Sequence, residues 1–117
     1  MKVRSFRDLD VWKLGKNLVV QVYEVTAGFP KTELFGLTAQ MRRAAISVPS
    51  NVAEGFNRRY PREFKRFLNV ALGSCAELET QIELAYEFRY LDEERKSLML
   101  DQLDHECRML RNLSKRL

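Results

Sequence analysis

Apolar residues recur every three or four positions through most of this chain, a spacing typical of amphipathic α-helices rather than of strands. In the first such stretch they form two neighbouring faces, Val11, Leu18, Val22 and Val25 on one and Leu9, Trp12, Val19 and Tyr23 on the other. The pattern predicts a helix from about Asp8, as its N-cap, to about Ala27. Gly28 is expected to end this helix in the left-handed conformation, and Pro30 cannot continue it.

A second helix is predicted from about Thr32 to Arg58. Its apolar positions lie three or four residues apart: Leu34, Leu37, Met41, Ala44, Val48 and Val52. Pro49 lies inside this span and lacks the N–H group that a helix interior needs. It therefore either kinks one continuous helix or separates two shorter helices, of which Ser47 would cap the second. Because the apolar spacing persists through the proline, we expect one helix with a kink at Pro49.

A third helix is predicted to begin at Pro61, since proline is tolerated in a first helical turn. Its apolar residues alternate steps of four and three, the spacing of a heptad seam: Phe64, Leu68, Ala71, Cys75, Leu78, Ile82 and Ala85. Asp92, Glu93 and Glu94 suit the N-terminus of a fourth helix. The same spacing continues there at Leu100, Leu103, Cys107, Leu110 and Leu117.

The connections between these helices are short, so consecutive helices are expected to run antiparallel. The fold class is therefore all-α, and residues 1–117 are expected to form a single up-down-up-down four-helix bundle. In such a bundle Cys75 and Cys107 lie at the same level if the last turn is centred near Leu91. We interpret them as two small buried residues rather than as a redox pair or a metal site.

The first and third helices carry more apolar residues than one bundle core needs. Beyond its seam, the third helix adds Phe67, Leu72, Leu84, Tyr86 and Phe88. One interpretation is a thick monomeric core with scattered exposed apolar residues. We favour a homo-oligomer in which neighbouring copies bury the second faces.

The composition of the 117 residues, 45% hydrophobic and 31% charged, excludes a disordered chain. Charges interrupt every apolar run before it reaches the roughly 20 residues that cross a bilayer. The N-terminus lacks an apolar stretch of signal-peptide length. We therefore expect a cytoplasmic protein with reduced cysteines and no membrane partner.

Charge is strongly segregated along the sequence, although the net charge is only +4. Residues 42–66 hold seven Lys/Arg and two Asp/Glu, residues 77–106 hold three and ten, and residues 108–117 hold four and none. Such segregation favours either head-to-tail self-association or an anionic partner at the basic end.

The sequence lacks the residue patterns that catalysis would need. His105 is the only histidine, and its polar surroundings on the fourth helix predict a surface position. There is no glycine-rich phosphate loop, no GxSxG motif and no nucleophile with a base at a recognisable spacing. Carboxylate pairs occur, but the di-iron bundle pattern needs two histidines. We expect no enzymatic activity, no cofactor and no metal.

Seven cations are the candidate residues for binding nucleic-acid phosphates: Arg42, Arg43, Arg58, Arg59, Arg62, Lys65 and Arg66. We expect them to surround the end of the second helix and the start of the third, interleaved with Phe56 and Tyr60. Arginine matches phosphate oxygens, and exposed aromatic rings stack on unpaired bases. Intersubunit ion pairs with residues 77–106 and plain solvation are the competing interpretations. Glu54 is expected to pair with an arginine or to cap backbone donors near Pro49.

Several motifs resemble those of the ribosomal RNA intervening-sequence proteins, small four-helix bundles encoded by reading frames inserted in bacterial large-subunit rRNA genes and also found elsewhere in genomes. The matching segments span nearly the whole chain: FRDLDVW at 6–12, Phe29-Pro30 followed by Glu33, LTAQMRRA at 37–44, SVPSNVAEG at 47–55, Gly73-Ser74 and Glu77-Leu78-Glu79. The proline-centred segment with its Ala-Glu-Gly ending is the specific part, and Val52 stands where the family often has isoleucine.

The resemblance implies an all-α bundle that assembles into a homo-oligomeric ring, with a pentamer as the expected state. It also implies kinship with the accessory protein of diversity-generating retroelements, a basic barrel that works with a reverse transcriptase and nucleic acid. We therefore expect a non-enzymatic, homo-oligomeric protein that binds RNA or DNA through the phosphate backbone. The alternative is an interaction scaffold that docks a partner such as a polymerase or a reverse transcriptase.

Overall fold

The structure, a computed structural model, describes residues 2–117 and contains no strand within them. Its four α-helices are α1 (Asp10–Thr26), α2 (Leu37–Asn57), α3 (Pro61–Glu87) and α4 (Glu93–Lys115). Two short 3-10 turns, η1 (Phe6–Asp8) and η2 (Lys31–Glu33), precede α1 and α2. The expected all-α fold with four helices is confirmed, in a molecule that measures 42 × 25 × 20 Å.

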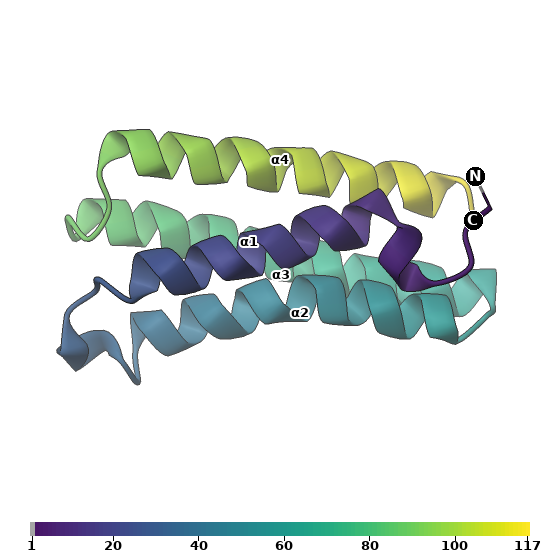
Figure 1. Cartoon of the computed structure of the whole chain (residues 1–117), viewed down its shortest axis with the longest axis horizontal. Helices are drawn as coiled ribbons and strands as arrows, with labels where there is room; N and C mark the ends of the chain where they lie inside the picture. Colours follow the sequence, from purple (N-terminus) through teal and green to yellow (C-terminus); the bar gives the residue numbers. More distant parts are fainter. Residues whose placement is uncertain (1) are drawn as a thin grey trace.

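The helices lie side by side along the long axis of the molecule (Figure 1). α1 contacts α2 and α4, and α3 contacts the same two helices, so α1 and α3 lie diagonally opposite each other. The two termini and the α2–α3 turn share one end of the bundle, and the α1–α2 and α3–α4 connections share the other (Figure 1). This arrangement determines which charged segments come together.

The bundle has a continuous apolar core to which all four helices contribute. The seven seam residues predicted for the third helix are all buried in α3, so that prediction is confirmed. The other helices add fully buried side chains, among them Leu18, Val22, Met41, Val48, Val52, Met99, Leu103 and Leu110. Burying a side chain of this size stabilises the fold by about 1.5–3 kcal/mol. No helix of the described residues is long and apolar enough to cross a membrane.

The first helix begins later than predicted. Asp8 does not cap α1, because its carboxylate closes a capping box around η1: Asp8 Oδ2 accepts the N–H groups of Arg4 at 2.9 Å and Ser5 at 3.1 Å. These hydrogen bonds to the charged form, the one from Arg4 first, lower the pKa of Asp8. α1 therefore starts after Leu9, and η1 fixes the N-terminal segment ahead of it.

The connection between α1 and α2 corrects two further predictions. No glycine in residues 2–117 has a positive φ, so Gly28 is not the expected left-handed cap, and α1 ends at Thr26. α2 begins at Leu37 rather than at Thr32, because Glu33 Oε1 accepts the N–H of Leu37 at 3.1 Å and satisfies a donor of the first helical turn.

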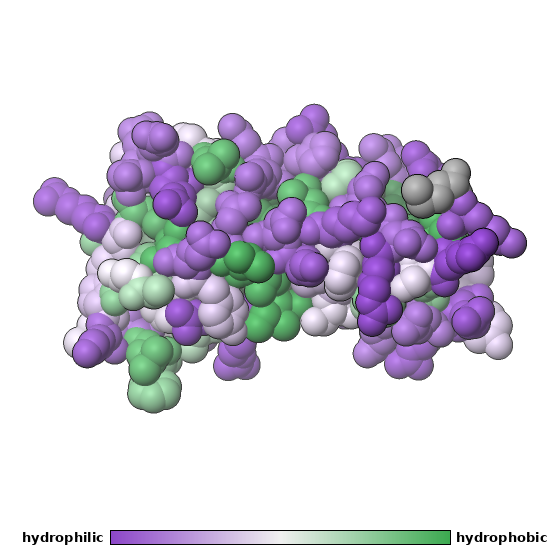
Figure 2. Space-filling view, viewed as in Figure 1, coloured by the Kyte–Doolittle hydropathy of each residue, from purple (hydrophilic) through white to green (hydrophobic). Residues whose placement is uncertain are grey.

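The later start of α2 leaves an apolar projection between α1 and α2. Leu34, predicted to lie on the apolar face of the helix, is 48% exposed, and Phe35 is 93% exposed. Figure 2 shows a group of apolar side chains at its lower left, on the side where Figure 1 draws the α1–α2 connection. Nothing within one chain covers Phe35, so this ring is available to another molecule.

α2 runs without interruption through Pro49, so the structure contains one continuous helix rather than two shorter ones. Pro49 is buried where α1, α2 and α4 approach one another. A Cβ atom built on Gly15 of α1 would lie 3.4 Å from Pro49 Cβ and 2.9 Å from Glu106 Oε2 of α4. The missing side chain at Gly15 therefore allows the three helices to meet at this level.

The buried face of α4 differs from its predicted seam. Leu103 and Leu110 are buried as predicted, but Cys107 is only partly buried and Glu106 is fully buried instead. Glu106 lies three residues after Leu103 and Cys107 lies four after it, so helical spacing allows either of them on the buried face. The prediction chose Cys107 because it is apolar, and that choice was wrong. His105, by contrast, is exposed as predicted.

The apolar residues outside the core are partly covered within a single chain. Leu9, Trp12 and Val19 of the second face of α1 are half-buried against the core. Val20 (50%) and Ile46 (41%) remain exposed, and Figure 2 shows apolar side chains gathered over the middle of α1 and α2. The exposed apolar surface outside the core is thus smaller than the sequence suggested, but part of it remains uncovered.

Candidate functional site

The α2–α3 turn carries the densest group of cations in the chain. α2 ends at Asn57, Arg58 is its C-cap, and Arg59 adopts the left-handed conformation with φ of 67°. Tyr60 is then extended and Pro61 opens α3, which reverses the chain within a few residues. Five cations lie in this short segment and define the basic turn surface: Arg58, Arg59, Arg62, Lys65 and Arg66.

Close helix packing holds this turn in place. A Cβ atom on Gly55 would lie only 2.8 Å from Phe67 Cβ and 2.9 Å from Phe64 Cδ1, so glycine is needed where α2 meets the start of α3. The rings of Phe56 and Phe64 pack edge to face, with centroids 6.0 Å apart. The cations therefore project from a fixed backbone rather than from a loose loop.

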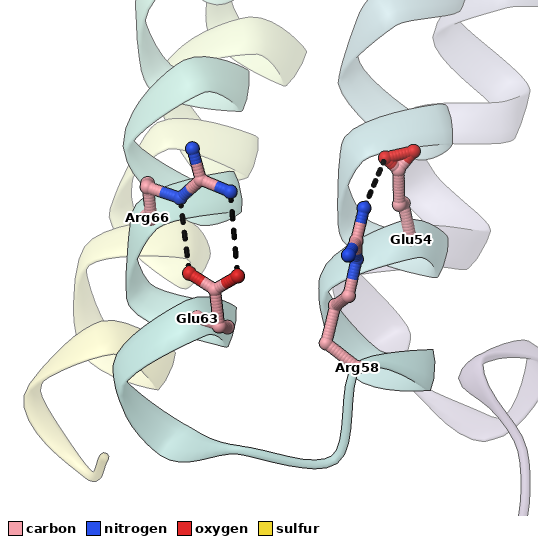
Figure 3. Close-up of polar contacts among 4 residues, drawn as sticks. All are labelled: Glu54, Arg58, Glu63 and Arg66. Atoms are coloured by element: carbon pink, nitrogen blue, oxygen red, sulfur yellow. Dashed lines mark hydrogen bonds and ion pairs between the residues drawn. The ribbon is translucent and has the colours of Figure 1, made fainter.

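Two of the five cations make local ion pairs, which Figure 3 shows on either side of the turn. Arg58 lies 3.8 Å from Glu54, so the expected pairing of Glu54 with an arginine is confirmed, and Arg66 Nε lies 3.1 Å from Glu63. Both guanidinium groups also lie over the ring of Phe67, at 5.2 and 5.1 Å. Because such exposed pairs contribute little free energy, a phosphate can compete for either arginine.

The other three cations of the basic turn surface have no ion-pair partner within residues 2–117. Arg59, Arg62 and Lys65 are exposed, and their charges face solvent. These cations break no ion pair when they contact phosphate oxygens, and the rigid turn loses little conformational freedom. They are the strongest candidates for that contact.

Arg42 and Arg43 do not belong to this surface, which corrects the predicted grouping. They lie near the start of α2, about 22 Å along the helix from Arg58 at 1.5 Å per residue. Arg42 is also engaged within the bundle, since its Nε donates to Thr26 Oγ1 at 2.9 Å and its guanidinium lies 4.4 Å from the Tyr23 ring centroid. Because all seven cations lie within residues 42–66, the prediction grouped them, but the length of α2 separates Arg42 and Arg43 from the others.

Cations near both ends of the chain also lie close to this surface, although the predicted site residues did not include them. Arg4 lines the same cavity as Arg59, and Lys115 and Arg116 follow at the end of α4, where the termini and the α2–α3 turn meet (Figure 1). Both ends of the chain lie beside the α2–α3 turn (Figure 1). The four-helix arrangement predicted from the sequence implies the same neighbours, so it could have identified these residues.

The centre of the bundle holds a second unusual group, far from the turn. Neither carboxylate oxygen of Glu106 has a hydrogen-bond partner among the described residues, and burial raises the pKa of Glu106 to about 8. Nearby, a hydrogen bond with Cys75 lowers the pKa of Cys107 and raises that of Cys75. No group of three metal-ligating side chains occurs in residues 2–117, so the centre offers no metal-binding geometry.

Comparisons with known proteins give a structural relative and a family. The fold matches the crystal structure of a protein of unknown function from the S23 ribosomal protein family of Bacteroides thetaiotaomicron VPI-5482. The TM-score is 0.82 over 90% of this chain and 95% of that one, at 20% sequence identity, a level that shows the fold alone. No curated protein sequence matches this chain. The family model described as 23S rRNA-intervening sequence protein matches residues 7–112, so the chain belongs to this family.

Proposed function

We propose that this chain is a non-enzymatic, homo-oligomeric protein that binds the phosphate backbone of RNA or DNA through the basic turn surface. The observation that carries the proposal is the set of three unpaired cations, Arg59, Arg62 and Lys65, on a turn that close packing of α2 and α3 keeps rigid. Contacts of this kind position a nucleic acid with little sequence preference and release counterions, so binding weakens steeply with salt.

The building block in this proposal is an antiparallel up-down-up-down bundle bent at Pro49, and its assembly is a cytoplasmic homo-oligomeric ring, a pentamer by family resemblance. The exposed apolar residues support self-association: Val20 and Ile46 over α1 and α2, and Phe35 on its projection. A ring would repeat the basic turn surface once per copy and join modest sites into one electropositive rim. Light scattering tests this step, and a mass near 13.8 kDa at micromolar concentration would contradict it.

A titration across salt concentrations tests the binding. Fluorescence anisotropy with a labelled structured RNA and a labelled single-stranded DNA should give a negative linear slope of log K against log salt. The variant Arg59→Ala/Arg62→Ala/Lys65→Ala should reduce that slope by about 2–3, because each lost phosphate contact contributes roughly 0.7–0.9. No binding by the wild-type chain at low salt would reject the proposal.

A matched control separates local from overall charge. Lys31, Arg89 and Arg95 are also exposed and without ion pairs in the described part of the chain, and they lie toward the opposite end of the bundle. Replacing these three with alanine removes the same net charge and should leave the slope unchanged.

The alternative function is a scaffold that docks a protein partner such as a polymerase or a reverse transcriptase. The exposed projection of Leu34 and Phe35 favours it, because exposed apolar side chains that are grouped together often mark protein contacts. A scaffold that does not use nucleic acid would retain the same residual RNA affinity after the three alanine substitutions in the basic turn surface. The two functions therefore predict different outcomes in one titration.

A further inference from the structure

A cavity of about 370 Å³ lies beside the basic turn surface, where three segments of the chain meet. The N-terminal segment contributes Arg4, the α2–α3 turn contributes Arg59 and Tyr60, and the last residue, Leu117, also lines the cavity. This volume falls within the range of pockets that take small planar ligands. Because the segments are far apart in sequence, only the folded bundle forms this cavity.

Two of the residues that line the cavity are aromatic rings held in place by each other. Phe64 is buried, and its ring packs edge to face against Phe56, with an angle of 88° between the ring planes. Both rings line the cavity. Apolar rings in the lining favour a flat, weakly hydrated group over a metal ion or a free phosphate.

One aromatic ring at the cavity has no partner within the described residues. Tyr60 is 69% exposed, and its hydroxyl and its ring make no hydrogen bond or aromatic pair in residues 2–117. Arg59 before it and Pro61 after it set the backbone conformation of Tyr60. A proline restricts the residue before it to extended geometry, which Tyr60 adopts. Tyr60 thus presents a free stacking surface from a fixed position.

Cations flank this stacking surface. Arg4 and Arg59 line the cavity, both side chains are exposed, and neither makes an ion pair within residues 2–117. Arginine or lysine beside a free aromatic ring is the combination with which proteins hold single-stranded nucleic acids, because every base has a face that can stack. Bases in a duplex are already stacked on their neighbours and cannot enter a cavity.

We propose that the cavity takes an unpaired base of a single-stranded RNA or DNA, stacked on Tyr60, with the adjoining phosphates on Arg4 and Arg59. The inference rests on the proposed function and narrows it from nucleic acid in general to single strands. Arg62 and Lys65 then extend the phosphate path along α3, since they follow Tyr60 by two and five residues.

Anisotropy titrations with three labelled probes test the proposal: an unstructured 12-nucleotide RNA, the DNA of the same sequence, and the blunt DNA duplex of that length. The wild-type chain should bind both single strands more tightly than the duplex. Tyr60→Ala should weaken single-strand binding about 5- to 150-fold, the usual loss on removing one stacking residue, and leave duplex binding unchanged. Tyr60→Phe should retain wild-type affinity.

The matched control is Phe88→Ala, which removes another ring, 53% exposed, at the C-cap of α3 and away from the α2–α3 turn, and it should change no affinity. Equal weakening of single-strand and duplex binding by Tyr60→Ala, or no weakening of either, would overturn the inference while the salt-dependent binding remained. Absence of any binding by the wild-type chain at low salt would instead remove the proposed function on which it rests.

Discussion

The α2–α3 and α3–α4 turns contain the same dipeptide, and its arginine adopts the left-handed conformation in both. An arginine followed by a tyrosine ends the helix in each, Arg59-Tyr60 in one and Arg89-Tyr90 in the other. The two arginines have φ of 67° and 66°, a left-handed conformation that costs about 1–2 kcal/mol for a residue with a side chain. The arginine N–H compensates in both turns by donating to the preceding helix, to Phe56 O at 3.3 Å and to Tyr86 O at 2.9 Å.

The two turns differ in what their side chains meet. The Tyr90 hydroxyl donates to Glu33 Oε2 at 2.9 Å and its ring packs against Phe29, which ties the α3–α4 turn to the α1–α2 connection. Tyr60 has no such contact and is exposed. The charged residues that lie nearest in sequence also differ: around Arg89 they are Glu87, Asp92, Glu93 and Glu94, and around Arg59 they are Arg58, Arg62, Lys65 and Arg66.

A left-handed arginine therefore follows two helices in different surroundings. At the α3–α4 turn it closes the bundle with every aromatic group engaged, and at the α2–α3 turn it displays a ring and a group of charges. The cations of residues 58–66 lie at one end of the molecule, and the acidic residues of the α3–α4 turn lie at the other (Figure 1). We therefore expect nucleic-acid binding to depend on the cations at a turn and not on its backbone conformation.

Exchanging the charges of the two turns should produce the largest effect. The variant Arg59→Glu/Arg62→Glu/Lys65→Glu should lose all measurable nucleic-acid binding at 0.1 M salt, because three phosphate contacts become three repulsions. Adding Glu87→Arg and Glu94→Arg to this variant should restore part of the salt-dependent affinity at the other end. Anisotropy measures both, with circular dichroism to show that the helices persist. Wild-type affinity in the first variant would refute the assignment of the charges.

The bundle centre supports both turns, and its stability should depend strongly on pH. The carboxyl group of Glu106 has a pKa of about 8 in the folded chain and an ordinary value of 4.5 in the unfolded chain. Between these two pKa values folding takes up a proton. The free energy of unfolding therefore falls as pH rises, by up to about 1.4 kcal/mol per pH unit. This loss of stability is complete above about pH 8. Several kcal/mol should separate pH 5 from pH 9 in urea unfolding.

Glu106→Gln is the matched variant for this prediction, because the amide has nearly the same shape and does not ionise. Its unfolding free energy should vary much less between pH 5 and pH 9 than that of the wild-type chain. An equal slope in both proteins would assign the pH dependence to other groups. Binding assays on the two turns are therefore best compared near pH 6, where Glu106 is protonated in the folded chain.

The contrast between turn and centre also explains what the sequence could predict. The seam of α3, the proline at its start and the Asp92 cap of α4, whose Oδ1 accepts the Arg95 N–H at 2.7 Å, all follow from local pattern and were predicted correctly. The burial of Glu106 was not, because a carboxylate on the core face contradicts the apolar pattern and depends on space left by Gly15.

The candidate site was predictable only in part for a related reason. Arg58, Arg59, Arg62, Lys65 and Arg66 are neighbours in sequence and form one surface. Arg42 precedes them by four helical turns and contacts Thr26 and Tyr23 of α1, which only a knowledge of helix pairing reveals. Local spacing predicts a helix and its turn well, but not the residues that distant segments bring together.

The close helix packing at the α2–α3 turn predicts a smaller effect on stability. Gly55→Ala should destabilise the chain by about 1–2 kcal/mol, since the overpacking against Phe64 and Phe67 outweighs the better helix propensity of alanine. Gly73→Ala is the matched control, because nothing lies within 4 Å of the Cβ position there, and it should stabilise by about 0.5–1 kcal/mol. Thermal unfolding measures both. Stabilisation by Gly55→Ala would show that α3 can shift away from α2.

Replacing each left-handed arginine with glycine should produce the smallest effects and compares the two turns directly. Arg59→Gly and Arg89→Gly should each leave stability unchanged or raise it by about 1 kcal/mol, because glycine adopts this conformation without strain. Only Arg59→Gly should weaken nucleic-acid binding, by about fivefold at 0.1 M salt, the contribution of a single phosphate contact. The two variants lose the same charge and the same backbone strain, so their difference in affinity isolates position alone. Equal weakening by both would mean that the net charge of the chain, rather than the α2–α3 turn, drives association.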